Sequence, residues 1–433
     1  MKKLLCLLLV LVMVFSLAAC GSDTGGSTEQ PSGNPGGQTQ NPNDNPPDEG
    51  GSQYEGVTLN FWSMWNSGEP QATVIADAAA AFEAQTGAHV NIEWKGRDIN
   101  TLLTASLGAG DAIDIFEDDY NRIGNVYAEY TADLTDMAAA ADYASHSYPF
   151  FVNQSKEWAG YLNSIVEQPQ IGGIFYNRDA IDDAGITDLP TTWAEFMDVC
   201  QKLKDAGIAP LAQDSAYCNF TFYYQLVRHL GEDGVADLRD NGNWAGNAGA
   251  VAAAQELIDL INAGYLVDGA PDEYPSSQNK VGTGAAAMVV CANYVTAEVD
   301  NIVGETNWGL INYPAVSNGA DPDSVYMGAN GLAIASYSEN KQAAFDFCMF
   351  LTTGEWDQKM ADTAKQIPAD PNNTCGYLPT AVDTLKNATN AMGWCSALNG
   401  HAAWGTMKTE FINLFEGKYA TGADFAAAMD ALY

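Results

Sequence analysis

Residues 173–196 read GIFYNRDAIDDAGITDLPTTWAEF, and this stretch contains the alternation of strand and helix that decides the fold. Ile174–Tyr176 is a short apolar run typical of a buried strand. Thr192 and Glu195 have the spacing of a capping box, in which each side chain accepts a hydrogen bond from the other residue's backbone N–H. Apolar residues then recur at helical spacing up to Gly207, so we expect a helix that begins at the capping box and ends at this glycine.

The same alternation extends through the chain from Val57 onward. Apolar runs and alternating patterns predict strands at 57–61, 90–94, 113–116, 208–212, 286–290 and 308–311. Helical spacing predicts helices at 70–86, 100–107, 251–262, 343–351 and 406–414. Strands that alternate with helices in this way indicate a layered α/β fold.

The first twenty residues have the pattern of a bacterial secretory leader. Lys2 and Lys3 precede the apolar run Leu4–Phe15, which is too short to span a bilayer comfortably. The run ends in Leu-Ala-Ala-Cys at Cys20, which resembles the lipobox of bacterial lipoproteins. We therefore expect a signal peptide at 1–19 and lipidation of Cys20. The alternative is a plain secretory leader in which this cysteine is incidental.

Residues 20–56 form the expected tether between the lipid and the folded part. Gly, Pro, Ser, Asn, Gln and acidic residues dominate this segment, which cannot bury enough apolar surface to fold. A flexible chain of this length reaches about 30–35 Å. We expect such a tether to hold a folded module at the extracellular face of the bacterial cell membrane while the module tumbles freely.

Length and charge limit the kinds of partner. The 433 residues exceed what one compact core usually holds, so we expect two domains. There are 55 acidic and 18 basic residues, which gives a formal net charge of -37. This charge disfavours binding to nucleic acid and a polybasic contact with anionic lipid.

Cysteine and histidine patterns predict neither a metal site nor a cofactor. The six cysteines beyond Cys20 form no C-x-x-C pair, and no two of the four histidines are near each other in the sequence. Disulfides are possible outside the cell. We nevertheless expect mostly buried free thiols, because Cys200 and Cys348 lie on apolar helix faces. No motif of a catalytic nucleophile or a phosphate-binding loop is present, and we predict no catalytic residues.

Three consecutive acidic residues, Glu117, Asp118 and Asp119, follow the predicted strand at 113–116. Ligands of open α/β sheets bind beyond the carboxyl ends of strands, so these carboxylates could accept hydrogen bonds from sugar hydroxyls. They could also be a glycosidase acid/base pair or a solvated acidic loop. Large aromatic residues that could stack on sugar rings also follow predicted strands, among them Trp62, Trp65, Tyr120, Tyr176 and Tyr294.

Several motifs in fixed order make residues 57–433 resemble the bacterial extracellular solute-binding proteins, the family that includes the maltose-binding protein. They are VTLNFW at 57–62, TASLGAGDAIDIF at 104–116, GIFYNR at 173–178 with AGI at 184–186 and PTTW at 190–193, GAAAM at 284–288, and residues 330–335. The resemblance implies a periplasmic-binding-protein-like type II fold, in which a hinge joins two α/β lobes around a ligand cleft. We expect crossings between the lobes near 167–170, 313–323 and 366–373.

The resemblance also implies domain boundaries and site residues. Lobe 1 would comprise residues 57–168 and 317–368, and lobe 2 residues 169–316 and 369–433. The ligand-binding candidates carried over by position are Glu117, Asp118, Asp119, Glu167, Asp214, Tyr294 and Trp404. Trp65 and Arg97 are added from their location. The segment Ala-Asn-Tyr at 292–294 departs from the family pattern, which often ends in Trp there, and this leaves the identity of the sugar open.

Three functions from different classes agree with these observations. The first is a monomeric, lipid-anchored binding protein that captures a mono- or oligosaccharide for the permease of an ABC importer. The second is a protein of the same fold that binds a peptide, polyamine or polyol-phosphate; the small number of basic residues disfavours a phosphorylated ligand. The third is a secreted glycosidase, for which the sequence offers no separated acid/base pair in a recognisable context.

Overall fold

The computed structural model describes residues 52–388 and 390–433. The described residues belong to one compact unit, Gly51–Tyr433. The predicted signal peptide, the predicted lipidation site Cys20 and nearly all of the predicted tether lie outside the described residues. Within the described ranges, no helix combines the length and the apolar character that a bilayer crossing requires.

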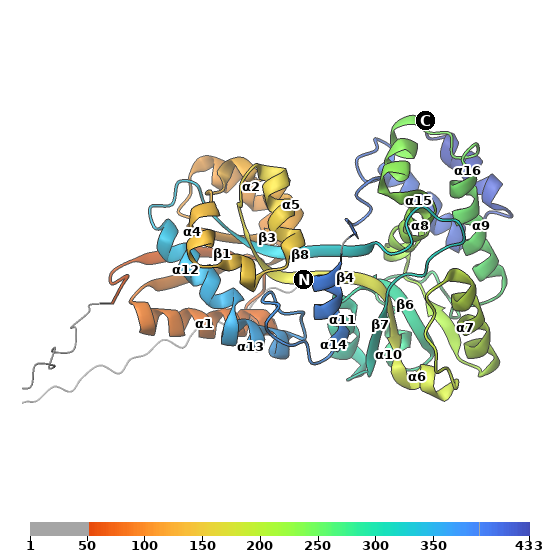
Figure 1. Cartoon of the computed structure of the whole chain (residues 1–433), viewed down its shortest axis with the longest axis horizontal. Coiled ribbons are helices and arrows are strands. Elements are labelled where there is room, and N and C mark those ends of the chain that lie inside the picture. Colours follow the sequence, from red (N-terminus) through yellow and green to blue (C-terminus); the bar gives the residue numbers. More distant parts are fainter. Residues whose placement is uncertain (1–51, 389) are drawn as a thin grey trace, which may run out of the picture. The chain divides into compact units, whose positions relative to one another are not determined.

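One sheet carries the first group of elements, which we call lobe 1 (Figure 1). In spatial order its strands are β2 (His89–Trp94), β1 (Thr58–Ser63), β3 (Ile115–Asp119), β8 (Val325–Ile334) and β4 (Ile165–Asn177). Strand β1 pairs in parallel with β2 and β3, whereas β8 runs antiparallel to β3 and β4. Its helices are α1 (Pro70–Thr86), α2 (Ile99–Ala109), α3 (Tyr120–Asn125), α4 (Thr135–Ala140), α5 (Pro149–Ala159), α12 (Lys341–Thr352) and α13 (Gly354–Ala364).

A second sheet carries lobe 2 and includes the distal half of β4. This half pairs antiparallel with β6 (Ala286–Ala292) and β7 (Trp308–Ile311), and β5 (Ala209–Ala212) pairs in parallel with β6. The lobe 2 helices are α6 (Arg178–Asp183), α7 (Trp193–Asp205), α8 (Cys218–Asn241), α9 (Ala248–Asn262), α10 (Asn279–Gly282), α11 (Tyr294–Val303), α14 (Pro379–Asn387), α15 (Trp404–Phe415) and α16 (Gly422–Asp430). The short strand β9 (Ala391–Met392) pairs with the start of β8.

The paired strands β4 and β8 connect the two sheets (Figure 1). Their shared ladder includes Pro169 opposite Ala329 and Gln170 opposite Gly328, and the register shifts just before it, between Val166 and Gln168. These two adjacent strands form a ribbon that both lobes share. The arrangement is the two-lobed α/β architecture that the sequence predicts.

One expected crossing lies elsewhere in the structure. Residues 313–323 belong to lobe 2, because the buried Arg228 donates hydrogen bonds to Tyr313 O at 2.9 Å and to Asp321 Oδ1 at 3.4 Å. The chain instead returns to lobe 1 along β8. Sequence inspection missed this because β8 contains Gly328 and Gly331, which interrupt its apolar pattern.

The structure contains the local features that short sequence patterns predict. Thr192 and Glu195 form the predicted capping box at the start of α7. The six cysteines of the described part are all unpaired and buried, as expected. β3 differs, because Glu117–Asp119 are its last residues rather than a loop, and each pairs with a residue of β8.

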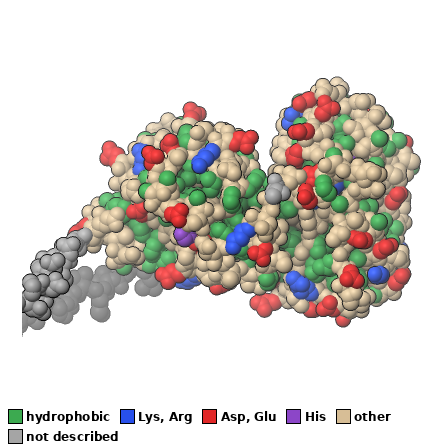
Figure 2. Space-filling model, in the orientation of Figure 1, with side chains coloured by type: hydrophobic (Ala, Val, Ile, Leu, Met, Phe, Trp, Pro, Cys, Tyr) green, Lys and Arg blue, Asp and Glu red, His purple; other side chains and the backbone are tan. Residues whose placement is uncertain are grey.

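Acidic side chains are spread over the visible face of the molecule, with few basic ones between them (Figure 2). This distribution agrees with the formal net charge of -37. A surface of this sign repels polyanions and offers no extended basic patch on the face shown.

Candidate ligand-binding site

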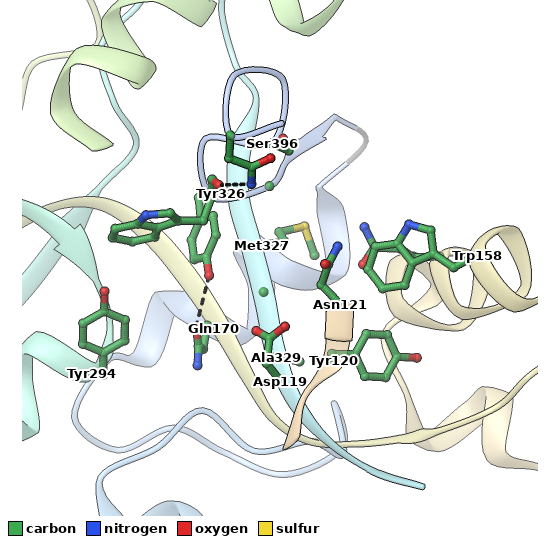
Figure 3. A pocket seen from close by; sticks show the side chains of 15 residues that line it. Asp119, Tyr120, Asn121, Trp158, Gln170, Tyr294, Tyr326, Met327, Ala329 and Ser396 are labelled. Atoms are coloured by element: carbon green, nitrogen blue, oxygen red, sulfur yellow. Dashed lines mark hydrogen bonds between the residues drawn. The ribbon is translucent and has the colours of Figure 1, made fainter. Parts of the chain in front are cut away.

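A cavity of about 410 Å³ lies where elements of both lobes meet the β4–β8 ribbon. Its lobe 1 wall comes from the end of β3, the start of α3 and the last turns of α5, and its lobe 2 wall comes from α11 and the loop after β9. Among the residues that line it are Asp119, Tyr120, Asn121, Trp158, Gln170, Tyr294, Tyr326 and Ser396, which Figure 3 labels, and also Trp394. We call this space the first cavity.

The lobe 2 wall of the first cavity is aromatic. The indole of Trp394 stacks on Phe220 with ring centroids 3.9 Å apart and planes 4° apart. The rings of Tyr326 and Trp394 are nearly perpendicular, at 84°, with their centroids 5.5 Å apart. One face of Trp394 is therefore fixed against the lobe 2 core, while the residue also lines the cavity. A flat apolar surface of this kind suits the C–H face of a ring-shaped ligand.

Polar groups line the lobe 1 side and the floor. Asp119 accepts a hydrogen bond from Arg122 N at 3.0 Å and so caps α3, which fixes the carboxylate at the cavity edge. Burial raises the pKa of Asp119. On the floor, Tyr326 donates from its hydroxyl to Gln170 Oε1 at 3.2 Å, as the dashed line in Figure 3 shows.

A second cavity of about 470 Å³ adjoins the first, because Gln170 and Tyr294 line both. It contains Trp65 and Arg97, two of the residues that location in the sequence suggested. The Arg97 guanidinium lies 4.4 Å from the Trp65 ring centroid and pairs with Glu69 at 2.8 Å.

Two buried polar atoms near the second cavity have no hydrogen-bond partner within the described chain. They are Trp65 Nε1, a donor, and Gln366 Oε1, an acceptor, and both residues line the cavity. Buried polar groups are nearly always satisfied in native proteins, so a missing partner points to a ligand or a water molecule. The Trp65 side chain also has the Glu117 carboxyl nearby, where it acts against the rise of the Glu117 pKa, so Gln366 Oε1 is the atom left for a donor from a ligand or a water molecule.

Glu117 and Glu167 form a buried carboxyl pair beside the ribbon, with exposed fractions of 0% and 3%. Glu117 accepts hydrogen bonds from Ser63 Oγ at 2.8 Å and Met64 N at 3.2 Å. Burial raises the pKa of both carboxyls, and the adjacent Glu117 raises the pKa of Glu167 further. A proton shared by the two would give Glu117 Oε1 and Glu167 Oε2 the partner that each lacks among the described residues.

Other predicted site residues take part in internal contacts. Asp118 is fully buried and pairs with Arg122, whose Nε lies 3.0 Å from Asp118 Oδ2. Asp214 is also fully buried and accepts from Ser277 N at 2.9 Å and Gln278 N at 3.0 Å. Burial raises the pKa of Asp214 to about 6. Neither residue is among those that line the two cavities.

Trp404 is half-buried at the first position of α15 and packs against Phe411, with ring centroids 6.1 Å apart. It lies outside the described lining of both cavities. Trp394, ten positions earlier, lines the first cavity instead. Both tryptophans precede or begin the same helix, so spacing alone could not distinguish them.

The structure thus brings together Asp119 and Tyr294 at the first cavity, and Trp65, Arg97 and Tyr294 at the second. Sequence reasoning missed Trp158, Gln170, Tyr326 and Trp394. Within residues 52–388 and 390–433, no three His, Cys, Asp or Glu side chains are placed to hold a metal ion. The first cavity offers aromatic surfaces, the Asp119 carboxyl and uncharged hydrogen-bonding groups, which suit a polar ligand that also has apolar faces, and the second cavity adds charged groups of both signs, among them Arg97 and Glu69.

Two curated relatives of this chain are named as binding proteins for small saccharides. The chain is 27% identical over 387 residues to the diacetylchitobiose binding protein DasA of Streptomyces coelicolor, covering 85% of this chain and 82% of the relative. It is 23% identical to the melibiose/raffinose/stachyose-binding protein MelE of Bacillus subtilis, covering 73% of this chain and 75% of the relative.

A solved chitin oligosaccharide binding protein shares the fold, with a TM-score of 0.66 at 20% identity, covering 87% of this chain and 98% of that chain. The sequence profile described as bacterial extracellular solute-binding protein matches residues 65–358, more than half of the chain. The chain therefore belongs to the bacterial extracellular solute-binding protein family.

Proposed function

We propose that this protein is the solute-binding component of an ABC importer and that its solute is a mono- or oligosaccharide. The relatives DasA and MelE are named for binding diacetylchitobiose and for binding melibiose, raffinose and stachyose. These names support a carbohydrate ligand, and membrane subunits of an importer are the partners that such a component serves.

The observation that carries the proposal is the lining of the first cavity. Trp158 lies on one side and Tyr294 on the other, with Asp119 and Asn121 between them (Figure 3). Of the described residues that line this cavity, none is lysine or arginine. Aromatic surfaces cover apolar sugar faces and the polar groups bind hydroxyls, whereas a phosphorylated ligand would be drawn to basic side chains.

The adjoining cavities favour a ligand longer than one ring. Gln170 and Tyr294 line both spaces, so a chain of sugars could continue from the first cavity into the second without leaving the ribbon. There the unpartnered Gln366 Oε1 would accept a hydrogen bond from one of its hydroxyls. We propose an oligosaccharide of at least two rings.

Two lobes that share a two-stranded ribbon provide a means of closing on such a ligand. A solute that contacts both lobes only in the closed state shifts the population toward that state. We propose that the permease recognises the closed form. The predicted boundaries, 57–168 for lobe 1 and 169–316 with 369–433 for lobe 2, remain a proposal, whereas the predicted second part of lobe 1, 317–368, loses residues 317–323, which contact Arg228 and His229 of lobe 2.

We further propose that the protein is a monomer held at the outer face of the cell membrane through a lipid on Cys20. The leader and the tether composition of residues 20–56 support this.

We also propose that the protein binds its ligand without hydrolysing it. The carboxyl pair Glu117 and Glu167 is too buried, at 0% and 3% exposure, to reach a ligand in either cavity. A glycosidase needs two accessible carboxyl groups on either side of the scissile bond.

A thermal-shift screen tests the proposal. Neutral mono- and oligosaccharides, sugar phosphates, polyamines and short peptides would each be added to the purified protein, because a ligand that binds only the folded state raises the melting temperature. We expect a neutral oligosaccharide to give the largest shift. A larger shift with a polyamine, a peptide or a sugar phosphate would contradict the proposal.

A further inference from the structure

Trp158 is a cavity residue that the sequence patterns do not single out. It is the penultimate residue of α5 and lines the first cavity on the side opposite Tyr294 (Figure 3). The side chain is half-buried, and its Nε1 makes no hydrogen bond to any residue that the structure describes. One large aromatic surface and one free donor are therefore available to a ligand.

The indole of Trp158 lies directly against Gly124 on α3. A Cβ atom at position 124 would lie 2.2 Å from Trp158 Cε3 and 3.0 Å from Cδ2, far inside van der Waals contact. The backbone of Gly124 is not in the left-handed region, so its conformation does not require glycine. Glycine lowers helix stability, so its presence at position 124 needs a reason. The Trp158 indole supplies one, because it occupies the space that a Cβ atom would need.

Tyr120 completes the support from below. Its ring centroid lies 6.0 Å from that of Trp158, and its hydroxyl donates to Phe151 O at 2.9 Å on α5. α3 and α5 thus fix the orientation of the Trp158 indole. The other wall is equally well fixed, because Trp394 is stacked on Phe220.

We propose that Trp158 is the lobe 1 half of a two-sided aromatic clamp on the saccharide, with Trp394 as the lobe 2 half, and that Gly124 is the positioning residue that seats Trp158. The clamp rests on the proposed function. Each lobe supplies one aromatic surface, so a sugar ring is covered on both faces only when both lobes hold it. The clamp therefore selects rings with apolar faces and couples their binding to the approach of the lobes.

The test compares Trp158→Ala, Trp158→Phe, Gly124→Ala and the double variant Gly124→Ala/Trp158→Ala in the otherwise intact chain. Gly108→Ala is the matched control. Gly108 also lies inside a lobe 1 helix, but its added Cβ would meet its nearest heavy atom, Tyr130 Oη, at an ordinary 3.5 Å. The dissociation constant for the strongest saccharide of the thermal-shift screen is measured by calorimetry, together with the ligand-induced change in tryptophan fluorescence.

Loss of one stacking surface should weaken binding about tenfold in Trp158→Ala and in Gly124→Ala. Trp158→Phe should retain most of the affinity but lose much of the fluorescence change. In the double variant, Gly124→Ala should cost nothing beyond Trp158→Ala, because the clash is gone. Gly108→Ala should bind like the wild type.

Failure of the inference and failure of the proposed function give different results. If the wild type binds no saccharide, the proposed function falls and the clamp falls with it. If the wild type binds and Trp158→Ala binds equally tightly, only the clamp is wrong. If Gly124→Ala weakens binding as much in the Trp158→Ala background as in the wild type, Gly124 acts on the fold in general and not through Trp158.

Discussion

Replacement of Trp394 by alanine tests whether Trp394, and not Trp404 at the start of α15, contacts the ligand. Full burial of a large apolar side chain contributes about 1.5–3 kcal/mol. Phe220 already covers one face of Trp394 at a centroid distance of 3.9 Å, so a ligand covers at most the other face. Trp394→Ala should therefore lose about half of that range, roughly 0.75–1.5 kcal/mol, which raises the dissociation constant about four- to twelvefold.

Trp404→Ala provides the matched comparison. Trp404 is half-buried against Phe411 and lies outside the described lining of both cavities. Both variants should lower the melting temperature of the unliganded protein, since each removes packing from the lobe 2 core.

Calorimetric titration at a temperature where both variants are folded, together with thermal melts without ligand, gives affinity and stability separately. We expect only Trp394→Ala to weaken binding. Equal weakening by both variants, or a larger effect of Trp404→Ala, would refute the assignment of the cavity wall.

Three further predictions concern pH, charge and location. Asp357 is buried in α13, and burial raises the pKa of its carboxyl to about 7. The folded state therefore holds this proton more tightly than the unfolded state, and the free energy of unfolding should fall as the pH rises from about 4 to 7. Asp357→Asn should reduce this pH dependence in thermal melts, and an unchanged dependence would contradict the assignment. Glu167→Gln, which imitates the protonated acid beside Glu117, should keep the melting temperature at pH 7 close to that of the wild type, whereas a large fall would show that the ionised pair is needed. Cys20→Ala should release the protein into the medium or block its processing, and membrane-bound protein processed as before would exclude a lipid anchor.

Local signals in the sequence predicted the fold well. The capping box at Thr192 and the helix-ending Gly87 and Gly207 depend on contacts within a few residues, and each appears where expected. β4 was predicted for only three of its thirteen residues. Its first half contains Pro169 between polar residues, which breaks the alternation from which strands are recognised.

The sequence predicted a site residue correctly only where that residue ends or directly follows a strand. Asp119 and Tyr294 follow or end strands, and both line a cavity. Trp158 and Trp394 reach the first cavity through the packing of α5 and of the loop after β9, which depends on residues distant in the sequence. The contact between Gly124 and Trp158 is an example, because the need for glycine at position 124 is evident only when the position of the Trp158 indole is known.

Reversible binding of an unmodified saccharide is the property that most directly defines the proposed function. The measurement is a calorimetric titration of the intact protein with the strongest oligosaccharide of the screen, followed by chromatographic recovery of that ligand. We predict one ligand per chain, recovered unchanged after prolonged incubation. The absence of heat and of any melting shift with every saccharide, or the recovery of hydrolysis products in proportion to protein concentration, would contradict the account.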